Sequence, residues 1–114
     1  MNWIPLTEEQ QLARIVEQSF SIPQVIFKHS TRCAISSMAK GRLDREKTPE
    51  GIPFYYLDLI KYRSVSNQVS QQFQVPHQSP QVLIISNGKS VYSESHNGID
   101  MGEILGNVTS TQGS

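Results

Sequence analysis

The fold is decided by the segment VIFKHSTRCAISSMA, residues 25–39. An apolar run of strand length stops at a short polar turn, and Cys33 stands where the next helix would begin. The first amides of a helix lack intrahelical partners and lie at the positive end of the helix dipole, so they stabilise a thiolate. Arg32 precedes the sulfur, and Lys28 and His29 lie a few residues upstream. We expect a reactive thiol here; the alternative is a small buried hydrophobe, as a lone cysteine often is.

The composition indicates one globular domain. Of the 114 residues, 37% are hydrophobic and 18% charged, which is too apolar for a disordered chain. We expect a single domain over residues 1–108 and a flexible C-terminal tail over 109–114. Ten basic residues balance ten acidic ones, so neither nucleic acid nor an anionic membrane is an expected partner.

The cysteine and histidine content restricts the chemistry. Cys33 is the only cysteine, and His29, His77 and His96 are widely spaced, so no zinc-type ligand pattern exists and we expect no metal site. One cysteine forms no internal disulfide. Because no signal-like N-terminus or membrane-length apolar run occurs, we expect a cytoplasmic protein whose thiol is kept reduced.

The first quarter of the chain predicts an edge strand and a helix. Pro5 suits a short edge strand over residues 3–6. Thr7 and Gln10 resemble an N-cap and its capping-box partner, which would start a helix running to about Ser19. The apolar face of this helix consists of Leu12, Ile15, Val16 and Phe20.

The middle of the chain predicts two strands, a helix between them and a surface loop. The strands cover residues 24–28 and 54–59. The helix that starts at Cys33 ends near Asp44. Asp58 lies near the end of the second strand, where an exposed position is a simpler interpretation than a buried acid that transfers protons. The helix carries the apolar residues Ile35, Met38, Ala39 and Leu43, and the loop covers residues 45–53.

The remainder predicts a helix, a hairpin and a last helix. Ser64 or Ser66 would cap the first of these helices, and Val75-Pro76 would end it. A strand over 81–86 leads into Asn87-Gly88, the strongest short hairpin signal. The other expected features are apolar positions at Val65, Val69 and Phe73, a return strand over 89–93, and a final helix with Ile99, Met101, Ile104 and Leu105.

This order of elements predicts an α/β, thioredoxin-like fold, with a central mixed sheet of four to five strands and helices on both faces. In that fold the reactive cysteine begins the helix after the first central strand, and a proline, usually cis, precedes the third strand and faces it. Cys33 and Pro80 occupy these places. Residues 33–36 form a C-x-x-S motif, so the site would be monothiol. Ser36 would donate a hydrogen bond toward the sulfur, or serve as an ordinary first-turn residue.

Several motifs together resemble the monothiol bacilliredoxin family, thioredoxin-like proteins of the bacillithiol system. The resemblance runs from about Trp3 to Ile104, and it departs at Ala34, where some relatives have proline. It is carried by the segments KHSTRCAIS at 28–36, YLDL at 56–59, SN at 66–67, HQSPQ at 77–81 and NG at 87–88.

The resemblance implies a thiol-disulfide oxidoreductase that removes bacillithiol, or a similar low-molecular-weight thiol, from protein mixed disulfides. Cys33 would be the nucleophile, with no bound cofactor. Its partners would be thiolated client proteins and the low-molecular-weight thiol, which acts as co-substrate.

The other candidate residues surround this nucleophile. Arg32 and Ser36 would stabilise the thiolate. The substrate cleft would be formed by Thr31, Ser79 and Pro80, although the last two also fit a plain turn. His29 and His77 would tune the thiol or serve as structural hydrogen-bonding groups.

Two other functions remain open from the sequence. The chain could be a non-catalytic thioredoxin-like binding module whose Cys33 is inert or becomes thiolated under stress. A monothiol iron–sulfur carrier would use Cys33 to ligate a cluster between two chains with an external thiol.

Overall fold

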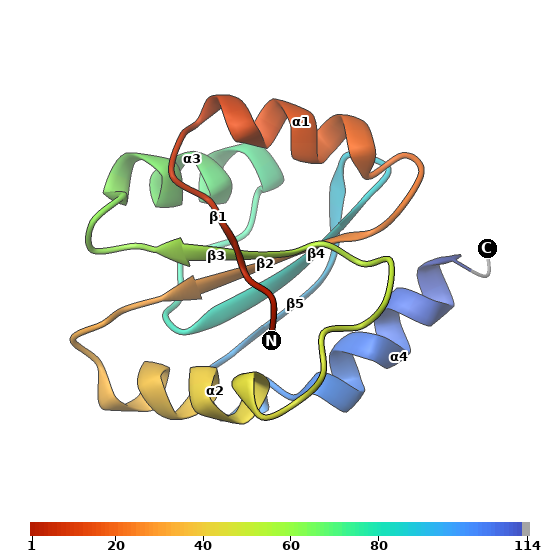
Figure 1. Cartoon of the computed structure of the whole chain (residues 1–114). Helices are drawn as coiled ribbons and strands as arrows, with labels where there is room; N and C mark the ends of the chain where they lie inside the picture. Colours follow the sequence, from red (N-terminus) through yellow and green to blue (C-terminus); the bar gives the residue numbers. More distant parts are fainter. Residues whose placement is uncertain (113–114) are drawn as a thin grey trace.

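The computed structural model describes residues 1–112 and contains a five-stranded mixed sheet between two layers of helices (Figure 1). The strand order is β1-β3-β2-β4-β5, with β1 and β2 parallel to β3, β4 antiparallel to β2, and β5 antiparallel to β4. The predicted α/β, thioredoxin-like arrangement is confirmed. The strands are β1 Ile4–Pro5, β2 Gln24–His29, β3 Phe54–Asp58, β4 Gln81–Ser86 and β5 Lys89–Ser95. The helices are α1 Gln10–Gln18, α2 Ala34–Asp44, α3 Arg63–Phe73, the short 3-10 helix η1 His96–Gly98, and α4 Met101–Gln112.

Two hydrophobic cores hold the layers together, one on each face of the sheet. Every residue of β2 and β4 is buried, which explains their continuous apolar runs. Side chains alternate along a strand, so Val25 and Phe27 of β2 pack toward α2 and α4, whereas Ile26 packs toward α1 and α3. The helices therefore cover both faces of the sheet, and neighbouring residues of β2 enter different cores.

The Asn-Gly hairpin forms as predicted. Asn87 and Gly88 have φ angles of 52° and 76°, which is the left-handed backbone that a tight two-residue hairpin requires. The return strand β5 continues to Ser95, two residues beyond its predicted end. The hairpin thus fixes β5 as an edge strand beside β4.

The predicted cap of the first helix is wrong. The helix begins at Gln10 and its N-cap, Glu9, makes no side-chain capping bond. Instead the Oε1 atom of Gln11 accepts hydrogen bonds from the backbone N–H groups of Thr7 and Glu8, at 2.7 and 2.9 Å. Phe20 lies beyond the helix and is 63% exposed rather than part of its buried face.

The predicted cap of α3 is also wrong. The N-cap is Tyr62, no side chain caps the helix, and Ser66 is buried. The turn before the helix is instead shaped by Asp58, whose Oδ1 atom accepts from the backbone N–H groups of Ile60 and Lys61. Asp58 therefore has a structural role at the strand end.

The C-terminal helix is longer than the sequence predicts. It continues through Gln112, into the segment 109–114 for which we expected a tail, and residues 113–114 lie outside the described part of the chain. Across residues 1–112 no helix has the length and apolar character needed to cross a membrane.

Candidate active site

Cys33 is the N-cap of α2, as the sequence predicts. It is half-buried and its backbone is extended, with φ −112° and ψ 121°. Its N–H group donates to the carbonyl of Ser30 at 3.2 Å, and its carbonyl accepts from the N–H of Ser37 at 3.0 Å. Cys33 thus lies where the first helical amides lack intrahelical acceptors, but its side chain makes no capping hydrogen bond to them. Thr31 and Arg32, just before it, are exposed.

Pro80 lies at the same end of the sheet. Lys28 of β2 and Gln81 of β4 form the last pair of this antiparallel ladder. Pro80 therefore lies opposite His29, one position beyond that pair. The Ser79–Pro80 peptide bond is cis, and Pro80 is buried. The Oγ atom of Ser79 is buried and has no hydrogen-bond partner among residues 1–112. An unpaired hydroxyl therefore lies next to Pro80.

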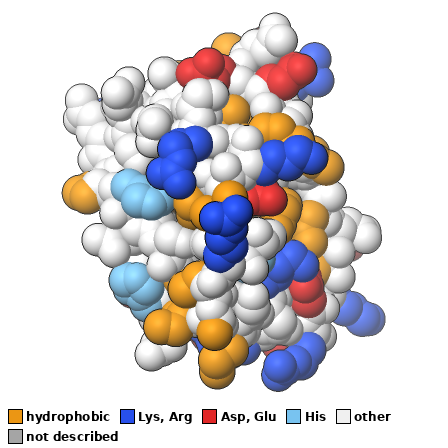
Figure 2. All heavy atoms as spheres, turned by 90° about the vertical axis from the view of Figure 1, so that its left-hand side faces the viewer, with side chains coloured by type: hydrophobic (Ala, Val, Ile, Leu, Met, Phe, Trp, Pro, Cys, Tyr) orange, Lys and Arg blue, Asp and Glu red, His pale blue; other side chains and the backbone are white. Residues whose placement is uncertain are grey.

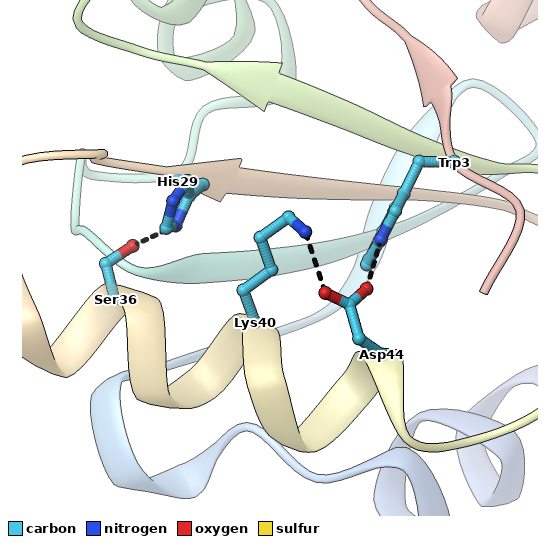
Figure 3. Close-up of polar contacts among 5 residues, drawn as sticks. All are labelled: Trp3, His29, Ser36, Lys40 and Asp44. Carbon is cyan, nitrogen blue, oxygen red and sulfur yellow. Dashed lines mark hydrogen bonds and ion pairs between the residues drawn. The ribbon is translucent and has the colours of Figure 1, made fainter.

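Ser36, one turn into α2, is fully buried and bonded to His29 (Figure 3). Its Oγ atom lies 2.7 Å from Nδ1 of His29 and accepts the N–H of Ser30 at 3.0 Å. The serine therefore ties the start of α2 to the end of β2. Within residues 1–112 no hydrogen bond joins Ser36 to the Cys33 sulfur, so the serine is the structural first-turn residue of the two alternatives and not a donor to the thiol.

The His29 ring belongs to a polar and aromatic cluster between the sheet and α2. It stacks on Phe27, with ring centroids 5.9 Å apart, and lies 5.6 Å from the ring of Tyr56. Lys40 of α2 lies over Tyr56, 5.5 Å from its centroid, and is ion-paired to Asp44 at 2.7 Å. Asp44 also accepts from the indole N–H of Trp3 at 2.6 Å (Figure 3).

Burial disfavours the charged form of His29. Burial lowers its pKa, and the charge of Lys40 adds to this effect, while Asp58 and Asp44 oppose it. In a neutral ring one nitrogen carries the proton, and which of them does so decides whether Nδ1 donates to or accepts from the Ser36 hydroxyl. The sequence had marked His29 as a candidate but offered no signal for Tyr56, Lys40 or Trp3, because their approach depends on the packing of α2.

Lys28 lies on the other face of the sheet, which the sequence did not reveal. Its side chain is completely buried, and its Nζ atom contacts Oγ of Ser70 in α3 at 3.0 Å and Nδ1 of His77 at 3.3 Å. His77 itself is exposed. The strand alternation next to Ile26 was the one signal that could have placed Lys28 there.

The surface at this end of the molecule combines cations with apolar side chains (Figure 2). Lys and Arg side chains gather across its middle, and hydrophobic side chains reach the surface below them. Ile35 and Met38 of α2 are 48% and 64% exposed, respectively, instead of facing the core. Within residues 1–112 no group of three or more His, Cys, Asp or Glu side chains is placed to hold a metal ion.

Comparison with known proteins agrees with this geometry. The family model described as monothiol bacilliredoxin BrxC matches residues 4–104. Among solved structures, a proposed oxidoreductase with a thioredoxin fold is 25% identical, with a TM-score of 0.80 and 91% of each chain covered. The thioredoxin of Malassezia sympodialis is 17% identical, with a TM-score of 0.71 over 96% of this chain and 90% of that one. Fasciola hepatica thioredoxin is 14% identical, with a TM-score of 0.73 over 94% and 97%.

Proposed function

Because the chain belongs to the monothiol bacilliredoxin family and has a thiol redox role, we propose that it removes bacillithiol, or a similar low-molecular-weight thiol, from protein mixed disulfides. The observation that carries this proposal is the position of its single cysteine, at the N-cap of α2 and at the same end of the sheet as Pro80. The reaction takes place in the cytoplasm, where client proteins become thiolated during oxidative stress and Cys33 is kept reduced.

The chemistry is two successive thiol-disulfide exchanges. The Cys33 thiolate attacks the small thiol's sulfur in the mixed disulfide, the old S–S bond breaks, and the client leaves as a thiolate. Cys33 then holds the small thiol as a mixed disulfide. Ser36 occupies the place of a second cysteine and has no thiol to displace this adduct. A second molecule of the small thiol attacks it, which frees Cys33 and releases a symmetrical small disulfide.

The surrounding residues support attack by the thiolate. Cys33 makes no side-chain capping bond, so support for the thiolate comes from the positive end of the α2 dipole and the exposed charge of Arg32, and Ser36 acts by fixing the start of the helix against His29. Thr31, Ser79 and Pro80 line the substrate cleft. The unpaired Ser79 hydroxyl supports this assignment, because a buried polar group without a partner can be satisfied by a bound substrate.

The test is transfer of the small thiol from a bacillithiolated model protein. The native protein should release the client and gain one bacillithiol on Cys33, detected by intact mass, whereas Cys33→Ala should do neither. Free bacillithiol should then regenerate the native protein. If the client keeps its bacillithiol while Cys33 is reduced and alkylatable, the oxidoreductase proposal is wrong and a binding module takes its place.

A further inference from the structure

Lys28 is a buried cation without a counter-charge. Its side chain has no exposed surface, and its two hydrogen-bond partners, Ser70 and His77, are neutral groups. Within residues 1–112 the one ion pair joins Lys40 and Asp44, on the other side of the sheet. A buried ammonium is costly to keep without an acid beside it, so such groups are often functional.

The contact between Lys28 and His77 determines which atom of each side chain carries a proton. A lysine ammonium only donates, so Nδ1 of His77 accepts from it and the ring proton lies on Nε2. Burial lowers the pKa of His77, and the charges of Lys28 and Arg63 lower it further, so the ring is neutral. His77 is exposed, so this contact connects the buried ammonium of Lys28 with a residue at the protein surface.

The pair lies at the Cys33 end of the sheet. Lys28 is five residues before Cys33, and His77 is three residues before Pro80. Lys28 and Gln81 are paired in register, and each contacts the turn before β4: Gln81 donates its amide to the carbonyl of Pro76 at 3.1 Å, and Lys28 contacts His77. The turn that leads to Pro80 is therefore held by two neighbouring strand residues.

We propose that Lys28 and His77 supply the proton taken up by the departing client thiolate when Cys33 attacks the mixed disulfide, an inference that rests on the proposed function. The S–S bond of the client breaks as the bond to Cys33 forms, and the client sulfur takes the proton from Nε2 of His77. Nδ1 of His77 takes a proton from Lys28, which becomes a neutral amine. Lys28 regains its proton from solvent by the reverse path, so no further reactant is needed.

The acidity of the pair suits this transfer. Burial lowers the pKa of Lys28 to about 8. An ordinary protein thiol has a pKa of about 8.5, so the proton moves between groups of similar strength, which is the favourable case for general acid catalysis. The charged or titratable group that faces the pair from α3 is Arg63; the register neighbours of Lys28 on β3 and β4 are Leu57 and Gln81, which do not titrate.

The test compares two leaving groups on one attacked sulfur. Mixed disulfides of bacillithiol are prepared with an aromatic thiol, 5-thio-2-nitrobenzoate, and with a cysteine peptide. The aromatic thiolate leaves without a proton at neutral pH, whereas the alkyl thiolate benefits from one. Single-turnover rates at pH 7 are measured for the native protein, Lys28→Met, His77→Gln and the control Lys89→Met, which alters an exposed lysine of β5.

We expect Lys28→Met and His77→Gln to slow the peptide reaction by about 10²-fold relative to the aromatic reaction, the lower range for general acid catalysis. In the native protein, the ratio of the peptide rate to the aromatic rate should fall as pH rises through about 8, because Lys28 loses its proton there. Both rates share the Cys33 thiolate fraction, which cancels in this ratio. The ratio should not change with pH in Lys28→Met.

Three results would overturn the inference: equal slowing of both reactions, no slowing of either, or a pH-independent ratio in the native protein. Should Lys28→Met fail to fold, His77→Gln, at an exposed position, gives the same comparison. If the native protein reacts with neither disulfide, the proposed function itself is wrong, and this result is distinct from the other three.

Discussion

Lys28 and His29 are neighbours in β2, yet their side chains enter opposite faces of the sheet and meet different surroundings. On the α2 face, His29 stacks on Phe27, lies tilted against Tyr56 and is bonded to Ser36, and Lys40 and Asp44 nearby form an ion pair. On the α3 face, Lys28 contacts Ser70 and His77, with no carboxylate paired to it in the described chain. The polar side chains of the α2 face are thus paired with one another, whereas the α3 face holds a titratable lysine that has no paired carboxylate in the described chain.

The largest effect on stability is expected from His29→Ala, on the α2 face. It removes a buried ring from between Phe27 and Tyr56 together with the bond to Ser36, and we expect the free energy of unfolding to fall by about 3 kcal/mol. Urea denaturation measures it. As a control, His96→Asn changes an exposed histidine and should alter stability by no more than about 0.5 kcal/mol. A loss below about 1 kcal/mol for His29→Ala would mean that these contacts on the α2 face contribute little to stability.

On the opposite face, Lys28→Met should change how stability depends on pH. The pKa of Lys28 is about 8 in the folded protein and 10.5 by default in the unfolded chain, so the unfolded state binds more protons between these values. The cost of burying the charged form of Lys28 is thus absent above pH 10.5. It grows as the pH falls toward about 8 and is complete below that value. At pH 7 we expect Lys28→Met to be more stable than the native protein by roughly 2 kcal/mol, and this advantage should vanish by about pH 10.5.

Denaturation curves collected from pH 7 to pH 10.5 would measure this change, with Lys89→Met as the matched control. A constant difference between the native protein and Lys28→Met over the whole range would show that Lys28 titrates normally. It would then not differ from a solvated lysine, and the contrast between the two faces would disappear.

A smaller effect is expected from Ser36→Ala. The hydroxyl accepts the N–H of Ser30 and contacts His29, so its removal leaves two buried groups unpaired and should cost about 1–2 kcal/mol of stability. Ser37→Ala is the control, because Ser37 is the next residue and is exposed. If the two variants lose equal stability by urea denaturation, the buried hydrogen bonds contribute nothing specific.

The smallest effect is expected from Lys40→Met. Its ion pair with Asp44 is partly exposed, with 29% and 39% of the two side chains accessible, so the free energy of unfolding should change by no more than about 0.5 kcal/mol. The pKa of His29 should rise, however, because Lys40 is one of the charges that lower it. An NMR titration of the histidine ring measures that direction. An unchanged or lower pKa would mean that Lys40 does not act on His29.

The elements themselves were determined by local sequence. The apolar run from Val25 to Phe27, the turn to Cys33 and the Asn87-Gly88 pair each act over a few residues, where strand propensity, helix entry and left-handed backbone dominate. Cys33 could therefore be placed at the start of a helix, and Pro80 before a strand, from the sequence alone. Helix caps were less predictable, because the side chain of Gln11 accepts from the Thr7 N–H before α1, and Asp58 accepts from the Ile60 N–H before α3.

The sequence by itself determined the order of strands and helices and the site of the single thiol, because these follow from short-range patterns and from composition. Only the tertiary structure decided which polar residues meet: Ser36 with His29, and Lys28 with Ser70 and His77. Such contacts join residues up to 49 positions apart, and burial rather than residue type sets their charge state. The physical reason is that desolvation depends on how the helices cover the sheet, which no local pattern encodes.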